Sequence, residues 1–352
     1  MSEPDIPPAA ATDARLASRD ARLIAVGTMI SRVSGLARVV VASAVLGTGA
    51  LGGLYESTNR IPNYLFELFA GGSLQAVLIP AFVKAREEGG IVSLRKLADS
   101  VSYTLSWVLA TVTTVGIALS PLISRLFMAA ESSHALYAQK VRLGTAFTIV
   151  FVPQVLCYGV AVVSSCVLAA NRRFFAAALA PAVNNVVAIA AYGVYRHLRH
   201  GQAPSLHFTP TEFVAIGVGT TVAVFAFALV PLVFALRTGS MGRPRRSPGL
   251  ARSVGLHRAG GWAVLQVAFG ITLSLTAVVI GNGATNGVGV YLWAQNFMLL
   301  PVGLIAYPIS TAIAPRLASA LLDRQHGGRT VRHDLGLVGR ARQRGGQLFL
   351  VG

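Results

Sequence analysis

Five charged side chains lie inside the first two apolar stretches of the sequence. They are Arg32, Arg38, Glu56, Arg60 and Glu67. A charged group at bilayer depth costs about 2.5–3.5 kcal/mol on insertion scales, so it is expected to face a cavity or a partner. A guanidinium group stays charged at any depth, and its planar donor fork fits phosphate oxygens. The arginines therefore predict a site for a phosphate-bearing ligand.

Four polar side chains of the second stretch share one helical face. They stand at i, i+4, i+7 and i+11, and are Glu56, Arg60, Asn63 and Glu67. Glu56 precedes Arg60 by four residues, which is the order that favours an ion pair. Pro62 is expected to kink this helix, as prolines do in transporter helices near a binding site.

We interpret these residues as the lining of a water-filled cavity between helices. The candidate ligand-binding side chains are Arg32, Arg38, Arg60 and Asn63. The candidates for charge balance in the cavity are Glu56 and Glu67. The alternative is that Arg32 extends to the membrane interface and that a neighbouring glutamate neutralises Arg60.

Amide side chains in later apolar stretches form a second group of candidates. Asn184 and Asn185 follow Pro181, and Asn296 follows Gln295. Such side chains commonly make hydrogen bonds between membrane helices. We interpret Asn184, Asn185 and Asn296 as helix-packing groups that could instead face the cavity.

The composition places these stretches in a membrane. Of the 352 residues, 54% are hydrophobic and 12% are charged. Soluble domains carry about 25% charged residues, and a soluble core of this length could not hide so much apolar surface. The sequence therefore predicts an all-α integral membrane protein.

The apolar segments predict about eight membrane-spanning helices. A spanning helix needs about 20 mostly apolar residues, and the glycine-rich segment 281–289 is a natural turn between the last two. The expected spans are 23–46, 54–84, 100–124, 143–171, 174–195, 213–236, 259–281 and 289–315.

The basic residues predict how these spans are oriented. With a cytoplasmic N-terminus, 22 of the 30 Lys and Arg residues fall in cytoplasmic segments, 5 in external loops and 3 within the membrane. Cytoplasmic loops of membrane proteins carry the excess of Lys and Arg. We therefore expect both termini in the cytoplasm, where basic loops would also attract anionic lipid headgroups.

Other classes of function are disfavoured. The net charge of +17 is spread over short segments between apolar stretches and does not form one basic face, which argues against nucleic-acid binding. The sequence has no P-loop, no nucleophile elbow and no metal-type cluster of His, Cys, Asp and Glu, so we expect no enzyme, metal or cofactor. Cys157 and Cys166 fall on opposite faces of one helix, which argues against a disulfide between them.

Six segments, taken in chain order, carry a resemblance to a known family. They are S-R-V-S-G-L-A-R at 31–38, R-I-P-N at 60–63, and the segments 68–82, 179–192, 217–226 and 299–319. In this order they resemble blocks of the MurJ/MviN family, the flippases of the lipid-linked peptidoglycan precursor. The resemblance covers about residues 20–320.

The resemblance implies a transporter of two six-helix lobes plus two further helices, working by alternating access. Arg32 and Arg38 would line the central cavity and help to bind the diphosphate of lipid II, which would move from the inner to the outer leaflet of the bacterial plasma membrane. The implied partners are lipid II, membrane lipids and cell-wall synthesis proteins. The chain departs from the family pattern at Val39 and Gly53, where acids are usual, and Asn296 falls near a usual arginine.

On this basis the chain is expected to have five regions. They are a disordered cytoplasmic leader (1–22), a six-helix N-lobe (23–236), a basic cytoplasmic loop (237–258), the first two helices of an incomplete C-lobe (259–318) and a basic, unstructured tail (319–352). The tail after Asp323 looks like coding sequence unrelated to the preceding segments, as a frameshift or a truncated gene model would produce. We therefore expect the chain to be inactive alone if it is truncated.

Two other interpretations stay open. The chain could be a related member of the same superfamily, termed MOP, that exports another lipid-linked glycan or a drug. It could also be a membrane scaffold or remnant that transports nothing. A drug exporter would use an acid of the second lobe to bind cations, and no Asp or Glu lies between Glu212 and Asp323.

Overall fold

The computed structural model describes five ranges of the chain, which are 8–69, 73–131, 133–247, 261–284 and 286–301. The chain divides into two units, Met1–Asn296 and Phe297–Gly352. The packing described below lies within the first unit, and the second is described only as far as Pro301. The expected tail 319–352 and the end of the last expected span therefore lie outside the described residues.

Every secondary-structure element in the described residues is helical, as the composition predicts. A short π-helical turn, η1 (Val214–Val218), joins α8 to α9. The α-helices are α1 (Pro8–Leu46), α2 (Ala50–Phe69), α3 (Ser73–Ala118), α4 (Ser120–Phe127), α5 (His134–Phe151), α6 (Gln154–Ala170), α7 (Phe175–Leu198), α8 (Pro210–Phe213), α9 (Gly219–Arg237), α11 (Gly261–Asn282) and α12 (Gly287–Pro301).

The first helix is longer than expected. α1 begins at Pro8, so the prediction of a disordered leader over 1–22 is wrong from Pro8 onward. Proline fits the first turn of a helix, where its missing N–H loses no hydrogen bond. The residues that follow are mainly Ala, Arg and Leu, which are strong helix formers. The apolar part of α1 begins only at Val26.

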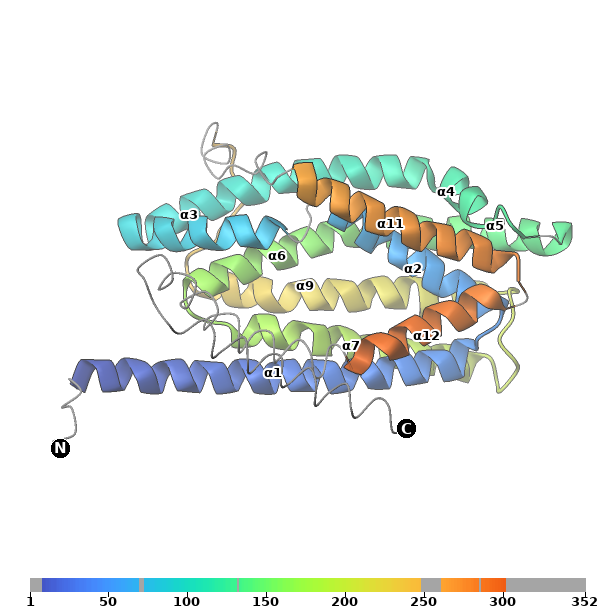
Figure 1. Cartoon of the computed structure of the whole chain (residues 1–352), viewed down its shortest axis with the longest axis horizontal. Helices are drawn as coiled ribbons and strands as arrows, with labels where there is room; N and C mark the ends of the chain where they lie inside the picture. Colours follow the sequence, from blue (N-terminus) through green and yellow to red (C-terminus); the bar gives the residue numbers. More distant parts are fainter. Residues whose placement is uncertain (1–7, 70–72, 132, 248–260, 285, 302–352) are drawn as a thin grey trace, which may run out of the picture. The chain divides into compact units, whose positions relative to one another are not determined.

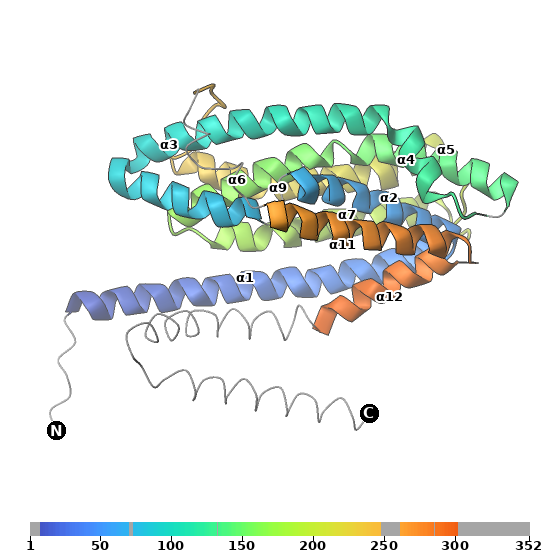
Figure 2. The same cartoon turned by 45° about the horizontal axis from the view of Figure 1, so that its top comes forward.

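The second expected span, 54–84, belongs to two helices. α2 ends at Phe69 and α3 begins at Ser73. α3 then turns back on itself at Gly89 and Gly90, whose backbone is not helical, and Gly90 has a φ of +64° that favours glycine. Both views show the two limbs of α3 side by side (Figures 1 and 2). The segment 84–99, expected as a loop, is therefore a helical hairpin.

Polar side chains gather inside the first unit, while large apolar side chains cover its surface. Thr148, Gln154 and Thr220 are buried, whereas Phe225 and Leu273 are exposed. α7 packs against α1 and α9, and α6 packs against α3 and α9. Polar side chains packed within the apolar core, beneath an apolar surface, are the arrangement that lipid surroundings favour.

Five segments of the described residues are long and apolar enough to cross a membrane. They are Val26–Leu46, Leu74–Ala118, His134–Ala170, Phe175–Leu198 and Pro210–Arg237. The third contains both α5 and α6, and begins before the expected residue 143. α2 is not among them, and it carries Glu56, Arg60 and Glu67. The chain is a multi-pass helical membrane protein.

The connections between helices gather at two ends of the first unit (Figure 1). One end holds the hairpin at Gly89–Gly90 and the connections 171–174 and 238–247. The opposite end holds the connections 47–49 and 199–209. The segments that sequence analysis assigned to one side of the membrane thus lie at one end.

The start of α12 lies close against the connection between α1 and α2. A Cβ atom added to Gly289 would lie 2.0 Å from the carbonyl oxygen of Thr48, and one added to Gly53 would lie 2.9 Å from the backbone nitrogen of Gly289. Glycine therefore allows the two backbones to approach at this point.

We predict that Gly289→Ala lowers the melting temperature of the purified chain by a few degrees, because overpacking a close contact costs about 1–3 kcal/mol. The matched control is Gly270→Ala in α11, where an added Cβ atom meets nothing within 4 Å. Thermal unfolding of both variants in detergent tests the prediction. Equal melting temperatures for the two variants would contradict it.

Candidate functional site

Three of the candidates named from the sequence line one cavity. Arg38 from α1, Asn63 from α2 and Asn184 from α7 surround a volume of about 250 Å³. Further polar lining comes from Asn59 and Tyr158. Segments far apart in the sequence therefore bring one cation and several hydrogen-bonding groups together inside the helical unit.

Arg38 is the only cation that lines this cavity in the described residues. Its Nε atom is buried and has no hydrogen-bond partner in the described structure. Its guanidinium lies beside Tyr192 and Tyr55, and the Glu56 carboxylate attracts it. A buried donor without a partner is costly, so the arginine retains capacity to bind an acceptor that enters the cavity.

A network of hydroxyl groups holds the wall behind Arg38. The Tyr55 hydroxyl lies 3.0 Å from that of Tyr192 and 2.8 Å from that of Thr220. Thr220 in turn donates to the carbonyl oxygen of Ile216 at 2.6 Å. The ring of Tyr55 packs edge-on against Phe151. This network joins α2, α7 and α9 and fixes the surroundings of the guanidinium.

Arg60 binds amide groups of α12 rather than the expected glutamate. Its Nη1 donates to Oε1 of Gln295 at 2.6 Å, and its Nη2 donates to Oδ1 of Asn296 at 3.4 Å. Asn296 also donates from Nδ2 to Oε2 of Glu56 at 3.5 Å. Among the ion pairs of the described residues, none joins Glu56 to Arg60. The predicted pair is therefore bridged by an amide, which satisfies both charges across two helices.

Asn184 and Asn185 have different environments. Asn184 lines the cavity, whereas Asn185 is buried and donates to the carbonyl oxygen of Ser31 at 3.3 Å and to the Ser34 hydroxyl at 3.1 Å. Asn185 thus ties α7 to α1 next to Gly35. The sequence could not separate these two roles, because it places both amides on one helix without showing which face packs.

Besides Glu56, Arg60, Asn185 and Asn296, whose contacts are described above, two more predicted residues do not line the cavity. Arg32 is half-buried on α1, and Glu67 is exposed near the end of α2. The continuous polar face expected on α2 therefore changes from a buried Glu56 to an exposed Glu67 along the helix.

Sequence analysis did not find several residues of the site. Asn59, Tyr158 and Thr220 line the cavity, and Tyr55 and Tyr192 hold its wall. Asn59 could have been found, because it stands four residues before Asn63 on the same helix. Tyrosines and threonines are common in apolar helices, so the others gave no signal.

The cavity can bind an anion by charge and by hydrogen bonds. The Arg38 guanidinium supplies the charge, and the amide groups of Asn59, Asn63 and Asn184 can donate hydrogen bonds. No group of three or more His, Cys, Asp or Glu residues gathers in the described part of the chain. The geometry suits recognition of a phosphate group.

Comparison with known proteins gives one consistent result. A family model described as "Lipid II flippase MurJ" matches residues 42–337. "Probable lipid II flippase MurJ" of Rhizobium tropici is 28% identical over 312 residues, which cover 85% of this chain and 55% of the relative. "Lipid II flippase MurJ" of Burkholderia cenocepacia is 26% identical over 298 residues, which cover 84% of this chain and 56% of the relative.

A solved structure resembles the fold. It is described as "Lipid II flippase MurJ, inward closed conformation", with a TM-score of 0.63 and 17% identity over 83% of this chain and 57% of that chain. The chain spans about half the length of the curated relatives it matches. The family match ends at residue 337, so the expected departure from the family directly after Asp323 is wrong. The family match begins at residue 42, so the segment 31–38 lies outside it.

We predict that Asn185→Ala lowers the melting temperature of the chain, whereas Asn184→Ala leaves it nearly unchanged. The first variant removes two hydrogen bonds between α7 and α1, each worth about 0.6 kcal/mol in membrane helices. The second shortens a side chain that faces the cavity. Thermal unfolding of the two neighbouring variants measures the difference. A larger loss for Asn184→Ala would contradict this assignment.

Proposed function

The chain belongs to the lipid II flippase MurJ family, and from that premise we propose that it moves lipid II from the inner to the outer leaflet of the bacterial plasma membrane. The observation that carries the proposal is the buried Nε of Arg38, which lines a polar cavity and has no partner among the described residues. The diphosphate of lipid II is an acceptor that suits this donor. This is transport of a lipid and requires no catalytic group.

The diphosphate binds first to Arg38 in this proposal. The cavity of about 250 Å³ takes the phosphate groups, and Asn63 and Asn184 donate hydrogen bonds to their oxygens. Tyr192 and Tyr55 hold the guanidinium in place. Charge-assisted hydrogen bonds of this kind are about twice as strong as neutral ones, so the site favours the doubly charged group over a neutral sugar.

Arg60 supplies a second cation during the transport cycle. In the described structure it is bound to the neutral amides of Gln295 and Asn296. A phosphate oxygen binds a guanidinium more strongly than an amide oxygen does. The substrate can therefore displace the amides, which frees α12 to move relative to α2 as alternating access requires. Glu56 balances the charge before the substrate arrives.

Both termini of the chain face the cytoplasm in this proposal. The excess of Lys and Arg in the segments at the end that holds 171–174 supports this orientation. In the same proposal lipid II moves from the inner to the outer leaflet, and cell-wall synthesis proteins are the expected partners.

We predict that a cysteine at residue 202 is labelled from outside intact cells and that one at residue 173 is not. Both sites are exposed and lie in connections at opposite ends of the unit. The substitutions Gln202→Cys and Arg173→Cys are made in a Cys157→Ser, Cys166→Ser background, and a membrane-impermeant maleimide reports access. Labelling of residue 173 alone in intact cells would reverse the orientation.

We predict that Arg38→Ala weakens binding of a lipid II analogue by roughly ten- to a hundredfold, because a hydrogen bond to a charged group contributes about 1.5–3 kcal/mol. Arg38→Lys should restore part of the affinity, since a point charge cannot reproduce the donor fork. Binding is measured on the purified chain by native mass spectrometry.

The control for this prediction is Arg142→Ala, which removes the same charge from an exposed position on α5. Its affinity should equal that of the unmodified chain. Unchanged affinity for Arg38→Ala would contradict the proposed phosphate site.

A further inference from the structure

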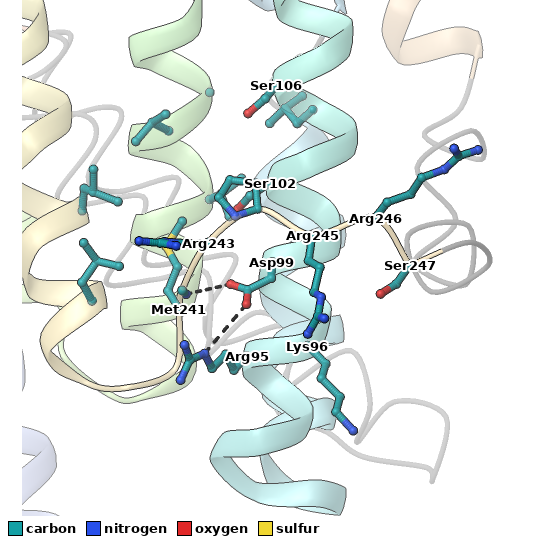
Figure 3. Close-up of a pocket in the computed structure, with 18 of the residues that line it drawn as sticks. Arg95, Lys96, Asp99, Ser102, Ser106, Met241, Arg243, Arg245, Arg246 and Ser247 are labelled. Atoms are coloured by element: carbon teal, nitrogen blue, oxygen red, sulfur yellow. Dashed lines mark hydrogen bonds and ion pairs between the residues drawn. The ribbon is translucent and has the colours of Figure 1, made fainter.

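A second, larger cavity of about 1230 Å³ lies at the end of the unit that holds the 238–247 connection. The second limb of α3 forms one wall, α6 and α9 form the others, and the segment 239–247 closes the end (Figure 3). It shares no lining residue with the Arg38 cavity. Its volume exceeds the roughly 300–1,000 Å³ of sites for drug-sized ligands, so it suits a larger ligand.

The mouth of this cavity is strongly basic. Five cations line it, namely Arg95, Lys96, Arg243, Arg245 and Arg246, and Asp99 is the only acid among the lining residues. Figure 3 shows Arg243 and Arg245 on either side of Asp99, whereas the side chain of Arg246 points away from it. This excess of charge within one pocket attracts an anion.

Both carboxylate oxygens of Asp99 have partners within the chain. Its Oδ1 accepts from the backbone N–H of Gly242 at 2.7 Å, and its Oδ2 lies 3.8 Å from Nε of Arg95. The backbone N–H of Arg245 donates to the Asp99 carbonyl oxygen at 3.1 Å. Asp99 therefore fastens the segment to α3. Within the described residues, Lys96 and the arginines of the segment form no ion pair.

The interior of the cavity is apolar. Leu105 and Leu109 of α3 face Val160 and Val163 of α6, and Leu232 of α9 completes the lining. Ten residues separate Asp99 from Leu109, which is about 15 Å along a helix at 1.5 Å per residue. This equals about half of the roughly 30 Å hydrocarbon core of a bilayer. The groove is therefore as deep as one leaflet.

An unpaired hydroxyl lies between the basic mouth and the apolar groove. Ser102 is 7% exposed and lines the cavity, and its Oγ has no hydrogen-bond partner in the described structure. Ser106 lines the cavity one turn deeper. Buried polar groups in proteins are rarely left without a partner, so the Ser102 hydroxyl can donate to an acceptor in the cavity, at the depth just below the cations.

We propose that this cavity binds an anionic glycerophospholipid. The phosphate group lies at the basic mouth, which Lys96, Arg243 and Arg246 line, an ester carbonyl accepts from Ser102, and an acyl chain fills the groove between α3 and α6. This order of phosphate, ester and hydrocarbon is the order of groups along such a lipid. A soluble phosphate would leave the groove empty, and a polyprenyl diphosphate has no ester carbonyl for Ser102. The site is thus distinct from the proposed lipid II site and does not depend on it.

The cations are tested with the purified full chain in detergent, using native mass spectrometry and phosphatidylglycerol as the probe. We expect phosphatidylglycerol to bind and phosphatidylcholine to bind much more weakly. The double variant Arg243→Gln, Arg246→Gln should weaken phosphatidylglycerol binding by about fivefold for each charge removed. The matched control is Arg172→Gln, Arg173→Gln, which removes two exposed charges at the same end but outside the cavity. Equal affinity of the two double variants overturns the proposal.

The hydroxyl and the groove are tested separately. The unmodified chain should prefer ester-linked over ether-linked phosphatidylglycerol by about fivefold, and Ser102→Ala should remove the preference, since one hydrogen bond is lost. Val160→Trp fills the groove and should weaken both lipids. Thermal unfolding confirms that each variant is folded. Displacement of phosphatidylglycerol by millimolar inorganic phosphate, stronger binding of a lipid II analogue that responds to the same variants, or no effect of Val160→Trp would each overturn the proposal.

Discussion

An ionised guanidinium inside a bilayer is tolerated only where polar groups surround it, and this constraint governs the packing around Arg38. α1 can carry the arginine because α2 and α7 bring Tyr55 and Tyr192 beside it. The tyrosine hydroxyls are themselves satisfied through Thr220 of α9. Phe147 and Phe151 then enclose the tyrosine rings. The contacts among these helices therefore follow from the need to enclose one charge while leaving one of its donors available.

The sequence predicted those parts of the site that depend on residue type alone. A charge or an amide inside an apolar stretch is visible without a structure, which is why Arg38, Asn63 and Asn184 were found and do line one cavity. Hydropathy likewise predicted the helical membrane class. The family resemblance agreed with the family match, because blocks in chain order carry more information than any single motif.

The rest depended on contacts between segments distant in sequence. Helical spacing placed Glu56 and Arg60 together, but it could not show that Gln295 and Asn296, more than 200 residues away, would bind both of them. Hydropathy also missed the start of α1 at Pro8. The residues before the apolar span are good helix formers, but they are not apolar, so a search for apolar segments does not detect them. The hairpin in α3 depends on the non-helical backbone of Gly89 and Gly90, of which Gly90 is left-handed.

The ion pairs of basic residues are more buried at one end of the unit than at the other. At the end that holds 199–209, Lys140 is paired with Glu131 and Arg199 with Glu212, and all four side chains are at most 10% exposed. These two cations contribute little to the electrostatic potential at this end, because each lies beside a buried acid. At the other end, Arg243 and Arg246 are exposed and make no ion pair within the described residues. An anionic membrane surface attracts those basic residues whose charge no neighbouring acid neutralises. Arg243 and Arg246 therefore supply uncompensated charge at the basic end, which supports both the proposed orientation and a lipid ligand there.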